Sequence, residues 1–193
     1  MELNVNDTEV VDIINNVFKS ADCLYTQQEV EQAINQMAYQ INQDFVDRNP
    51  IVLSIMNGGL VFAGQLLTKL TFPLNIDYCH ATRYRGETSG GELHWKALPQ
   101  YELRDRHVLV VDDILDEGHT LMAILNAITA QGAKSVKTAV LLDKRHERKA
   151  KPDYRADYVG IEIPDRYVFG YGMDYKEYLR NAPGIYALPD SQA

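Results

Sequence analysis

Four carboxylates lie within six residues of one another, directly after the apolar run 108–111. They are Asp112, Asp113, Asp116 and Glu117. Like charges held a few ångströms apart repel by about 1 kcal/mol per pair even in water-like surroundings, so a bound cation would relieve this crowding. The sequence therefore predicts a divalent-metal site, most naturally for Mg²⁺, at the end of a strand.

The same loop continues through Gly118, His119 and Thr120 into a helical pattern. Free backbone N–H groups and the helix dipole make a helix N-terminus favourable for phosphate. One loop thus offers a metal-binding face and a phosphate-binding face. A ligand with a metal-bound diol at one end and a monophosphate at the other would fit it.

Two other classes of protein must be compared with this interpretation. The simpler alternative to such a site is an acidic loop at the end of a strand, of the kind that receiver domains use to bind Mg²⁺. A P-loop nucleotide enzyme is disfavoured, because the sequence contains no Gly-x-x-x-x-Gly-Lys-Ser/Thr run.

The elements that position this loop follow from hydrophobic periodicity. Helical spacing predicts helices, and short apolar or alternating runs predict strands. Helices are expected at residues 7–18, 26–47, 60–70 and 120–131, and strands at 51–56, 74–82, 107–111, 136–142 and 158–163. The second helix begins at Thr26 with Glu29 three residues later, a capping-box pattern. Alternating strands and helices predict an α/β fold with a mainly parallel twisted sheet, whose ligands lie beyond the carboxyl ends of the strands.

Composition limits the class of protein. The chain has 193 residues, 46% of them hydrophobic, which predicts one domain with a sizeable core. The net charge of −8 argues against binding nucleic acid or an anionic membrane surface. The only cysteines, Cys23 and Cys79, are expected to be reduced thiols, and no apolar stretch is long enough for a membrane span. We expect a cytoplasmic protein.

The polar span 85–100 contains three glycines and the single tryptophan. A loop of this length inside a compact domain is typically a lid over a site or a disordered excursion. We predict a mobile lid at residues 85–100.

The stretch 108–121 resembles the phosphoribosyl pyrophosphate signature of the type I phosphoribosyltransferases: an apolar strand, two acidic residues, two apolar residues, then Asp-x-Gly-x-Thr. The resemblance implies that Asp112 and Asp113 hold the ribose hydroxyls and the Mg²⁺. It also implies that Asp116 is the general base for N7 of a purine. The phosphoribosyl phosphate would be bound by Asp116, Glu117, Gly118, His119 and Thr120.

Further segments between residues 51 and 180 resemble one branch of that family, the hypoxanthine-guanine phosphoribosyltransferases. The resemblance implies that Lys144 donates to the purine O6, that Tyr167 stacks on the base and that the Val168 backbone reads its edge. Asp174 would lie near the base and act on a second Mg²⁺. The metal-binding residues implied are therefore Asp112, Asp113 and Asp174.

Pyrophosphate would be bound by Asn57, Gly58 and Arg180, with a cis peptide bond before Asn57. The family often has lysine where this chain has Asn57, and many relatives have serine where it has Arg83. Arg83 and Tyr84 would begin the lid.

The resemblance also implies the architecture. A single phosphoribosyltransferase domain would span residues 1–193, with a core at about 26–160 and a small hood formed by about 161–193 together with the N-terminal segment. A homodimer or homotetramer is expected.

The activity implied is transfer of the 5-phosphoribosyl group from phosphoribosyl pyrophosphate to N9 of hypoxanthine or guanine. Two alternatives remain: a transferase that prefers xanthine or another 6-oxopurine, and a non-catalytic regulator that senses phosphoribosyl pyrophosphate. The second is disfavoured by the joint presence of Asp116, Lys144 and Asp174. The remaining histidines, His80, His94, His107 and His146, lack metal-ligand spacing and are expected to be surface or satisfied residues.

Overall fold

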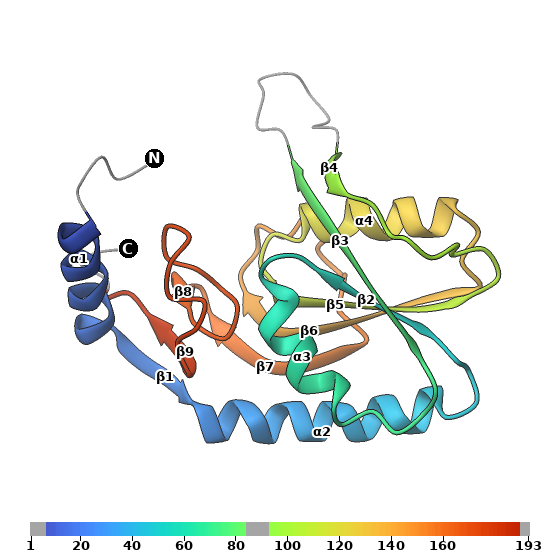
Figure 1. The fold of residues 1–193 in the computed structure, drawn as a ribbon, viewed down its shortest axis with the longest axis horizontal. Coiled ribbons are helices and arrows are strands. Elements are labelled where there is room, and N and C mark those ends of the chain that lie inside the picture. Colours follow the sequence, from blue (N-terminus) through green and yellow to red (C-terminus); the bar gives the residue numbers. More distant parts are fainter. Residues whose placement is uncertain (1–6, 84–92, 190–193) are drawn as a thin grey trace.

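A computed structural model describes residues 7–83 and 93–189 of the chain (Figure 1). In chain order the elements are α1 (Asp7–Ser20), β1 (Asp22–Thr26), α2 (Gln27–Phe45), β2 (Ile51–Ile55), α3 (Gly59–Leu67), β3 (Asn75–Arg83), β4 (Leu93–Ala97), β5 (His107–Leu115), α4 (His119–Ala130), β6 (Ser135–Arg145), β7 (Tyr158–Pro164), β8 (Val168–Phe169) and β9 (Gly184–Ala187). In this part of the chain, no helix is long and apolar enough to cross a membrane.

The central sheet contains six strands in the order β4-β3-β2-β5-β6-β7. The pairs from β3 through β7 are parallel, and only the edge strand β4 is antiparallel, to β3. This confirms the predicted α/β class with a mainly parallel sheet.

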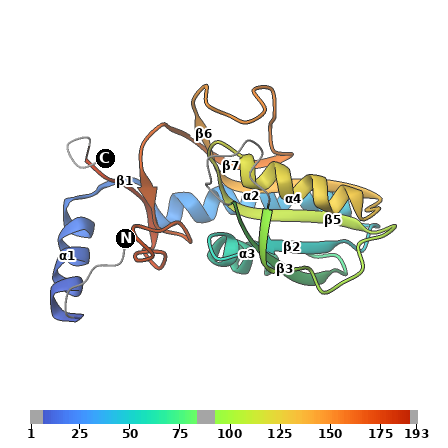
Figure 2. The ribbon, with the colours of Figure 1, turned by 90° about the horizontal axis from the view of Figure 1, so that it is seen from above.

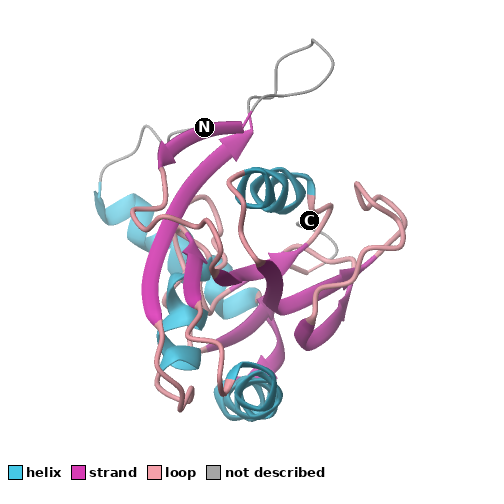
Figure 3. Ribbon diagram, turned by 90° about the vertical axis from the view of Figure 1, so that its right-hand side faces the viewer, coloured by secondary structure: helices cyan, strands magenta, loops and turns pink. Residues whose placement is uncertain are grey.

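Helices cover both faces of the central sheet. Side chains alternate between the two faces of a strand, so Leu109 and Val111 of β5 join a hydrophobic core with α2 and α3. Val108 and Val110 join a second core with α4. Figure 3 shows α4 above the sheet and α2 below it, as in Figure 1. Burial on both faces makes β5 a central strand, which fixes the direction of the residues at its carboxyl end.

The predicted capping box at the start of α2 is present. The Thr26 side chain accepts from the Glu29 backbone N–H, and the Glu29 carboxylate accepts from the Thr26 N–H at 2.8 Å. Such reciprocal bonds satisfy donors that a helix N-terminus otherwise leaves free. They also begin the helix directly after β1, so that α2 lies along the sheet.

A second, three-stranded sheet of order β1-β9-β8 lies beside the central sheet (Figure 2). Its strands β1 and β9 pair antiparallel, with Asp22 opposite Ala187, so an early and a late segment of the described chain lie side by side here. Phe18 of α1 contacts Tyr186 of this sheet edge to face, with ring centroids 4.9 Å apart. None of these three strands was predicted from the sequence.

Two predicted loops are shorter in the structure than the sequence indicated, and the lid role of the first stays a prediction. Residues 85–100 were expected to be a lid loop, but Leu93–Ala97 form β4, because Trp95 and its neighbours at alternate positions turn toward the interior. The remainder of the predicted lid up to residue 92, with Tyr84, lies outside the described residues. The loop expected to begin at Asp112 begins later, because β5 stays paired with β6 as far as Leu115.

Candidate active site

Asp112 and Asp113 lie on β5 itself, where ladder hydrogen bonds hold their backbone. Asp112 is paired with Val140 of β6. Both side chains are partly buried. Burial raises the pKa of Asp112 well above its ordinary value, and the neighbouring charge of Asp113 raises it further. Burial also raises the pKa of Asp113, partly offset by the hydrogen bonds that its carboxylate accepts. The ionised form of both carboxyl groups is therefore disfavoured, and a bound cation or a ligand with several hydrogen-bond donors would stabilise it.

Asp116 has the opposite electrostatic environment. Its Oδ2 accepts from Lys144 Nζ at 2.7 Å, and its Oδ1 lies 2.6 Å from His146 Nε2. Burial raises the pKa of Asp116, but the hydrogen bonds from Lys144 and His146 outweigh it and leave the pKa below its ordinary value. Asp116 is thus an ionised carboxylate, ready to accept a proton or a hydrogen bond.

The loop from Asp116 to Thr120 surrounds a pocket of about 330 Å³. It is lined by Asp112, Ile114, Asp116, Glu117, Gly118, His119, Thr120 and Leu121. Gly118 has a φ of 79°, a left-handed conformation that glycine adopts without steric cost, and it is the N-cap of α4. The Glu117 carbonyl accepts from the Ala150 N–H at 2.7 Å. This bond fixes the loop, and the first turn of α4 provides the free N–H groups that an anion needs.

A second pocket of about 270 Å³ adjoins the first. It is lined by Asp113, Ile114, Asp116, Lys144, Tyr167, Val168, Met173 and Asp174. Ile114 and Asp116 line both pockets. Tyr167 is 44% exposed and packs edge to face against Tyr175, which leaves ring surface free for a planar ligand. The structure therefore brings the four residues predicted to bind the purine into one pocket.

Arg180 and Asp174 form an ion pair, with Arg180 Nη2 2.8 Å from Asp174 Oδ1. Arg180 also donates to the Gly172 carbonyl at 2.8 Å and to Glu177 at 3.0 Å. The positive charge of Arg180 lowers the otherwise raised pKa of Asp113, so it acts on the acidic pair as well.

The segment containing Asn57 and Gly58 lies directly against the acidic pair. The Met56–Asn57 peptide bond is cis, as the sequence resemblance implied. A methyl group built on Gly58 would overlap the Asp113 carboxylate, and one built on Gly172 would overlap the Gly58 carbonyl. Position 58 has no room for a side chain, because Gly58 lies against Asp113 on one side of the contact and against Gly172 on the other.

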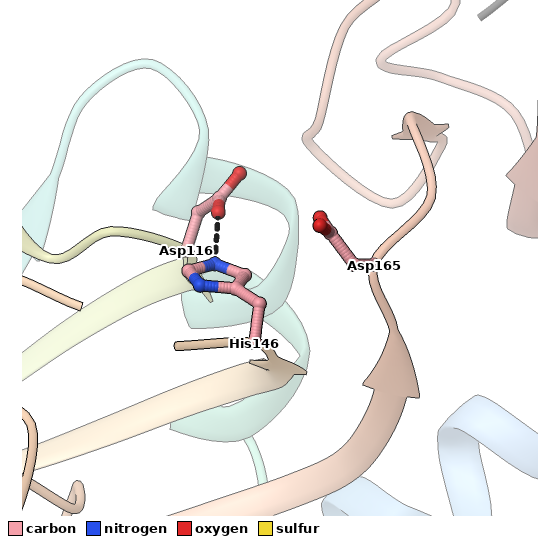
Figure 4. A group of neighbouring side chains, drawn as sticks. All are labelled: Asp116, His146 and Asp165. Carbon is pink, nitrogen blue, oxygen red and sulfur yellow. Dashed lines mark hydrogen bonds and ion pairs between the residues drawn. The ribbon is translucent and has the colours of Figure 1, made fainter. Parts of the chain in front are cut away.

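Neither His146 nor Asp165 was predicted as a site residue; His146 was expected to be a surface or satisfied histidine. Figure 4 shows both side chains near Asp116, with Asp165 approaching from the end of β7. His146 is almost fully buried, with a side chain 4% exposed. One feature could have indicated it: His146 lies only two residues after Lys144.

Asp116, His146 and Asp165 each offer a ligand atom, and these atoms lie within 4.8 Å of one another, so the group could hold a metal ion. However, Lys144 already pairs with Asp116, and Arg148 pairs with Asp165 at 2.6 Å. A basic side chain thus already compensates the charge of each of these two carboxylates. A metal ion would therefore stabilise this group less than it would stabilise Asp112 and Asp113. The predicted metal ligands are divided between the pockets: Asp112 lines the first, and Asp113 and Asp174 line the second.

The residues predicted to begin the lid are described only in part. Arg83 is the last residue of β3, and Tyr84 is not among the described residues.

Comparison with known proteins adds independent information. The family described as "Phosphoribosyl transferase domain" matches residues 20–177. A hypoxanthine-guanine-xanthine phosphoribosyltransferase from Tritrichomonas foetus is 34% identical over 168 residues, covering 87% of this chain and 91% of that protein. A hypoxanthine-guanine phosphoribosyltransferase from Streptococcus pneumoniae is also 34% identical over 168 residues, covering 86% of this chain and 92% of that protein.

Among solved structures, a hypoxanthine phosphoribosyltransferase from Staphylococcus aureus is similar over its whole length. The two chains superpose with a TM-score of 0.84 at 27% identity, and the match covers 99% of this chain and 98% of that chain.

Proposed function

The chain belongs to the phosphoribosyl transferase family, as the sequence predicted, and from this premise we propose that it transfers the 5-phosphoribosyl group of phosphoribosyl pyrophosphate to N9 of hypoxanthine or guanine. The products are IMP or GMP and pyrophosphate. The observation that carries the proposal is the pair of adjoining pockets that share Ile114 and Asp116. Bringing two reactants together in the right orientation is a large part of the barrier to a bimolecular reaction. Two reactants held on either side of one carboxylate have already met that cost and need little further motion to react.

The first pocket takes the ribose 5-phosphate. Backbone N–H groups of Glu117, Gly118, His119 and Thr120 donate to the phosphate, and the Thr120 hydroxyl adds one donor. The side chains of Glu117 and His119 are about half exposed and are dispensable for this role. The site is specific for a dianion because α4, a helix of 12 residues, adds its dipole to these N–H groups.

The second pocket takes the purine. Tyr167 stacks on the ring, and the Val168 backbone contacts its edge. Lys144 donates to the exocyclic O6, and a lysine ammonium has no acceptor for the amino group of adenine. The pocket therefore prefers 6-oxopurines.

The residues that would hold Mg²⁺ line the two adjoining pockets. Asp112, Asp113 and Asp174 provide hard carboxylate oxygens of the kind Mg²⁺ prefers, and the raised pKa values of the first two fit a site completed by a cation. Bound Mg²⁺ supplies charge neutralisation for the leaving diphosphate. Asn57 and Gly58 present backbone groups to the diphosphate, and Arg180 supplies positive charge nearby.

Asp116 is the general base. Positive charge develops on the ribose as the diphosphate leaves, and the purine must lose its N7 proton as N9 attacks. Asp116 lies in the wall common to both pockets and is ionised, so it accepts that proton without forming a covalent intermediate.

The decisive experiment incubates the protein with Mg²⁺, phosphoribosyl pyrophosphate and hypoxanthine, guanine or xanthine in turn, and measures nucleotide formation. We expect rapid formation of IMP and GMP. Preference for xanthine would instead support the alternative suggested by the name of the Tritrichomonas relative. Binding of the donor without turnover of any base would overturn the proposal and favour a sensing regulator.

Two wider expectations accompany the proposal. The reaction uses small molecules, so no nucleic-acid or membrane partner is required, and we place the enzyme in the cytoplasm. We also expect a homodimer or homotetramer, which sedimentation equilibrium measures directly.

A further inference from the structure

We infer that His146 is a positioning residue for Asp116: a neutral imidazole, fixed in one tautomer by the backbone of Arg148, that holds the carboxylate in place for proton transfer from the purine. This inference deepens the proposed function and depends on it. It concerns a contact between residues 30 positions apart in the sequence.

The tautomer follows from two hydrogen bonds to the same ring. The backbone N–H of Arg148 donates to His146 Nδ1 at 3.1 Å. A nitrogen that accepts a hydrogen bond carries no hydrogen, so the ring hydrogen of neutral His146 is on Nε2. That nitrogen lies 2.6 Å from Asp116 Oδ1, and it therefore donates to the carboxylate.

His146 is held in this position by the segment that follows it. Arg148 pairs with Asp165 through two hydrogen bonds, at 2.6 and 3.0 Å. The buried Lys149 ammonium pairs with the buried Asp143 carboxylate. Two residues after His146, the chain is thus tied to the end of β7, and one residue later it is tied to β6. A donor held by such neighbours loses little freedom when it binds Asp116.

Lys144 and His146, the two hydrogen-bond partners of Asp116, are expected to respond differently when a purine base binds. Lys144 is proposed to donate to the purine O6, and in doing so its ammonium turns toward the ligand. His146 bonds the other oxygen of Asp116, is not among the residues that line the base pocket and has no such alternative. His146 is therefore the partner that continues to orient Asp116 while the carboxylate accepts the N7 proton.

Two substitutions separate this role from simple support of the loop. In His146→Gln, the amide nitrogen takes the place of Nε2 and can still donate to Asp116, whereas the acceptor facing Arg148 is lost. In His146→Asn, the amide oxygen takes the place of Nδ1 and can still accept from Arg148, whereas the donor to Asp116 is lost. His107→Ala is the matched control, because His107 lies at the opposite end of β5 and bonds to Ser135.

Steady-state kinetics with Mg²⁺, phosphoribosyl pyrophosphate and hypoxanthine should give a roughly tenfold lower kcat for His146→Asn, with the KM for the donor unchanged. His146→Gln and His107→Ala should stay within about threefold of the parent protein. Equal losses in the Asn and Gln variants, or a larger loss in Gln, would overturn the inference and assign His146 to loop support.

The pH profile provides a second readout. The charged groups facing Asp116 are Lys144, Arg148, Asp165 and the neighbouring Glu117, and the neutral His146 is the titratable group beside them. Losing a donor to the ionised carboxylate disfavours its charge. The acid limb of kcat/KM should therefore move to higher pH in His146→Asn and stay in place in His146→Gln. An unmoved limb in the Asn variant would contradict the role.

Nitrogen NMR of the parent protein tests the geometry without any turnover. We expect a protonated Nε2 and an unprotonated Nδ1 on His146; the opposite tautomer would overturn the inference. If the parent protein makes no nucleotide, the proposed function fails, and the NMR result still decides whether His146 donates to Asp116.

Discussion

Replacing Asp116 by asparagine tests the centre of the proposed reaction. Asparagine keeps the shape of the side chain and one acceptor oxygen, but it cannot take up the N7 proton. General-base catalysis contributes about 10² to 10⁴ in rate, equivalent to about 2.7 to 5.5 kcal/mol of activation free energy. We therefore expect kcat for IMP formation to fall by about 100-fold or more.

The fold should tolerate this change. Asp116 is 41% exposed, but the Lys144 side chain is only 10% exposed, so the substitution leaves a largely buried ammonium without its charged partner. The His146 N–H can still donate to the asparagine oxygen. Urea denaturation should therefore show a loss of about 1 to 3 kcal/mol with one cooperative transition, so the variant stays folded and a 100-fold loss of turnover reflects the missing base.

The donor site should also survive. Phosphate is proposed to bind backbone N–H groups, which the substitution does not remove, so calorimetry with Mg²⁺ should give a donor affinity within about threefold of the parent value. Glu117→Gln is the control: it removes the adjacent carboxylate, is isosteric and should leave kcat within about threefold. Near-normal turnover in Asp116→Asn, or an equal loss in Glu117→Gln, would refute the assignment of Asp116 as general base.

Three further perturbations test neighbouring parts of the structure. Gly58→Ala should weaken binding of phosphoribosyl pyrophosphate by about tenfold or more in calorimetry, because the new methyl group overlaps the Asp113 carboxylate and overpacking costs about 1–3 kcal/mol; unchanged affinity would mean that this contact is unimportant. Lys144→Met should raise the KM for hypoxanthine by about tenfold to a hundredfold, the effect of losing a charged hydrogen bond, while the donor KM stays constant; an unchanged base KM would exclude Lys144 from O6 recognition. Asp44→Asn should lower the free energy of unfolding by about 1 kcal/mol or less at neutral pH, because hydrogen bonds from Tyr158 and Lys137 lower the pKa of the partly exposed Asp44. Since that pKa is lowered by folding, the stabilisation exists above the ordinary aspartate pKa and disappears as the pH falls through the folded-state value. The difference between the two proteins in urea titrations should therefore shrink as the pH is lowered below the ordinary aspartate pKa.

The parts of this structure that the sequence predicted are those encoded locally. The apolar run before Asp112 and the helical spacing after Thr120 identify a strand, a loop and a helix within a few residues. The capping box at Thr26 and Glu29 is equally local. Such signals depend on neighbours in the chain, so one sequence is enough to read them.

The missed parts depend on contacts between distant segments. Strand β1 is stabilised by pairing with β9, in which Asp22 lies opposite Ala187. No local pattern near residue 22 indicates that distant partner. Strand β8 contains only two residues, too few for any periodicity. Strand β4 was missed for a different reason: its alternation from Leu93 to Ala97 was present, but the surrounding polar and glycine residues favoured a loop.

His146 illustrates the same limit at the level of the site. Its type is compatible with many roles, and its proximity to Asp116 arises only because β5 and β6 are neighbouring parallel strands with Leu115 opposite Asp143. Parallel neighbours end at the same edge of a sheet, so the residues that follow them meet. The pairing of two strands, rather than any motif, creates this contact.

The sheet and the side-chain partners position the acidic residues in different ways, and this difference bears on mechanism. Asp112 and Asp113 cannot move apart, because ladder hydrogen bonds hold β5 beside β6, and their pKa values stay raised. Asp116 lies just beyond the strand and keeps a lowered pKa only because Lys144 and His146 donate to it. A bound cation is therefore expected to change the first pair most, whereas a bound base changes Asp116 most, by drawing Lys144 away. In the proposed reaction, Asp112 and Asp113 would act on the charge of the leaving diphosphate and Asp116 would act on the incoming purine, so separate parts of one strand end would control the two steps.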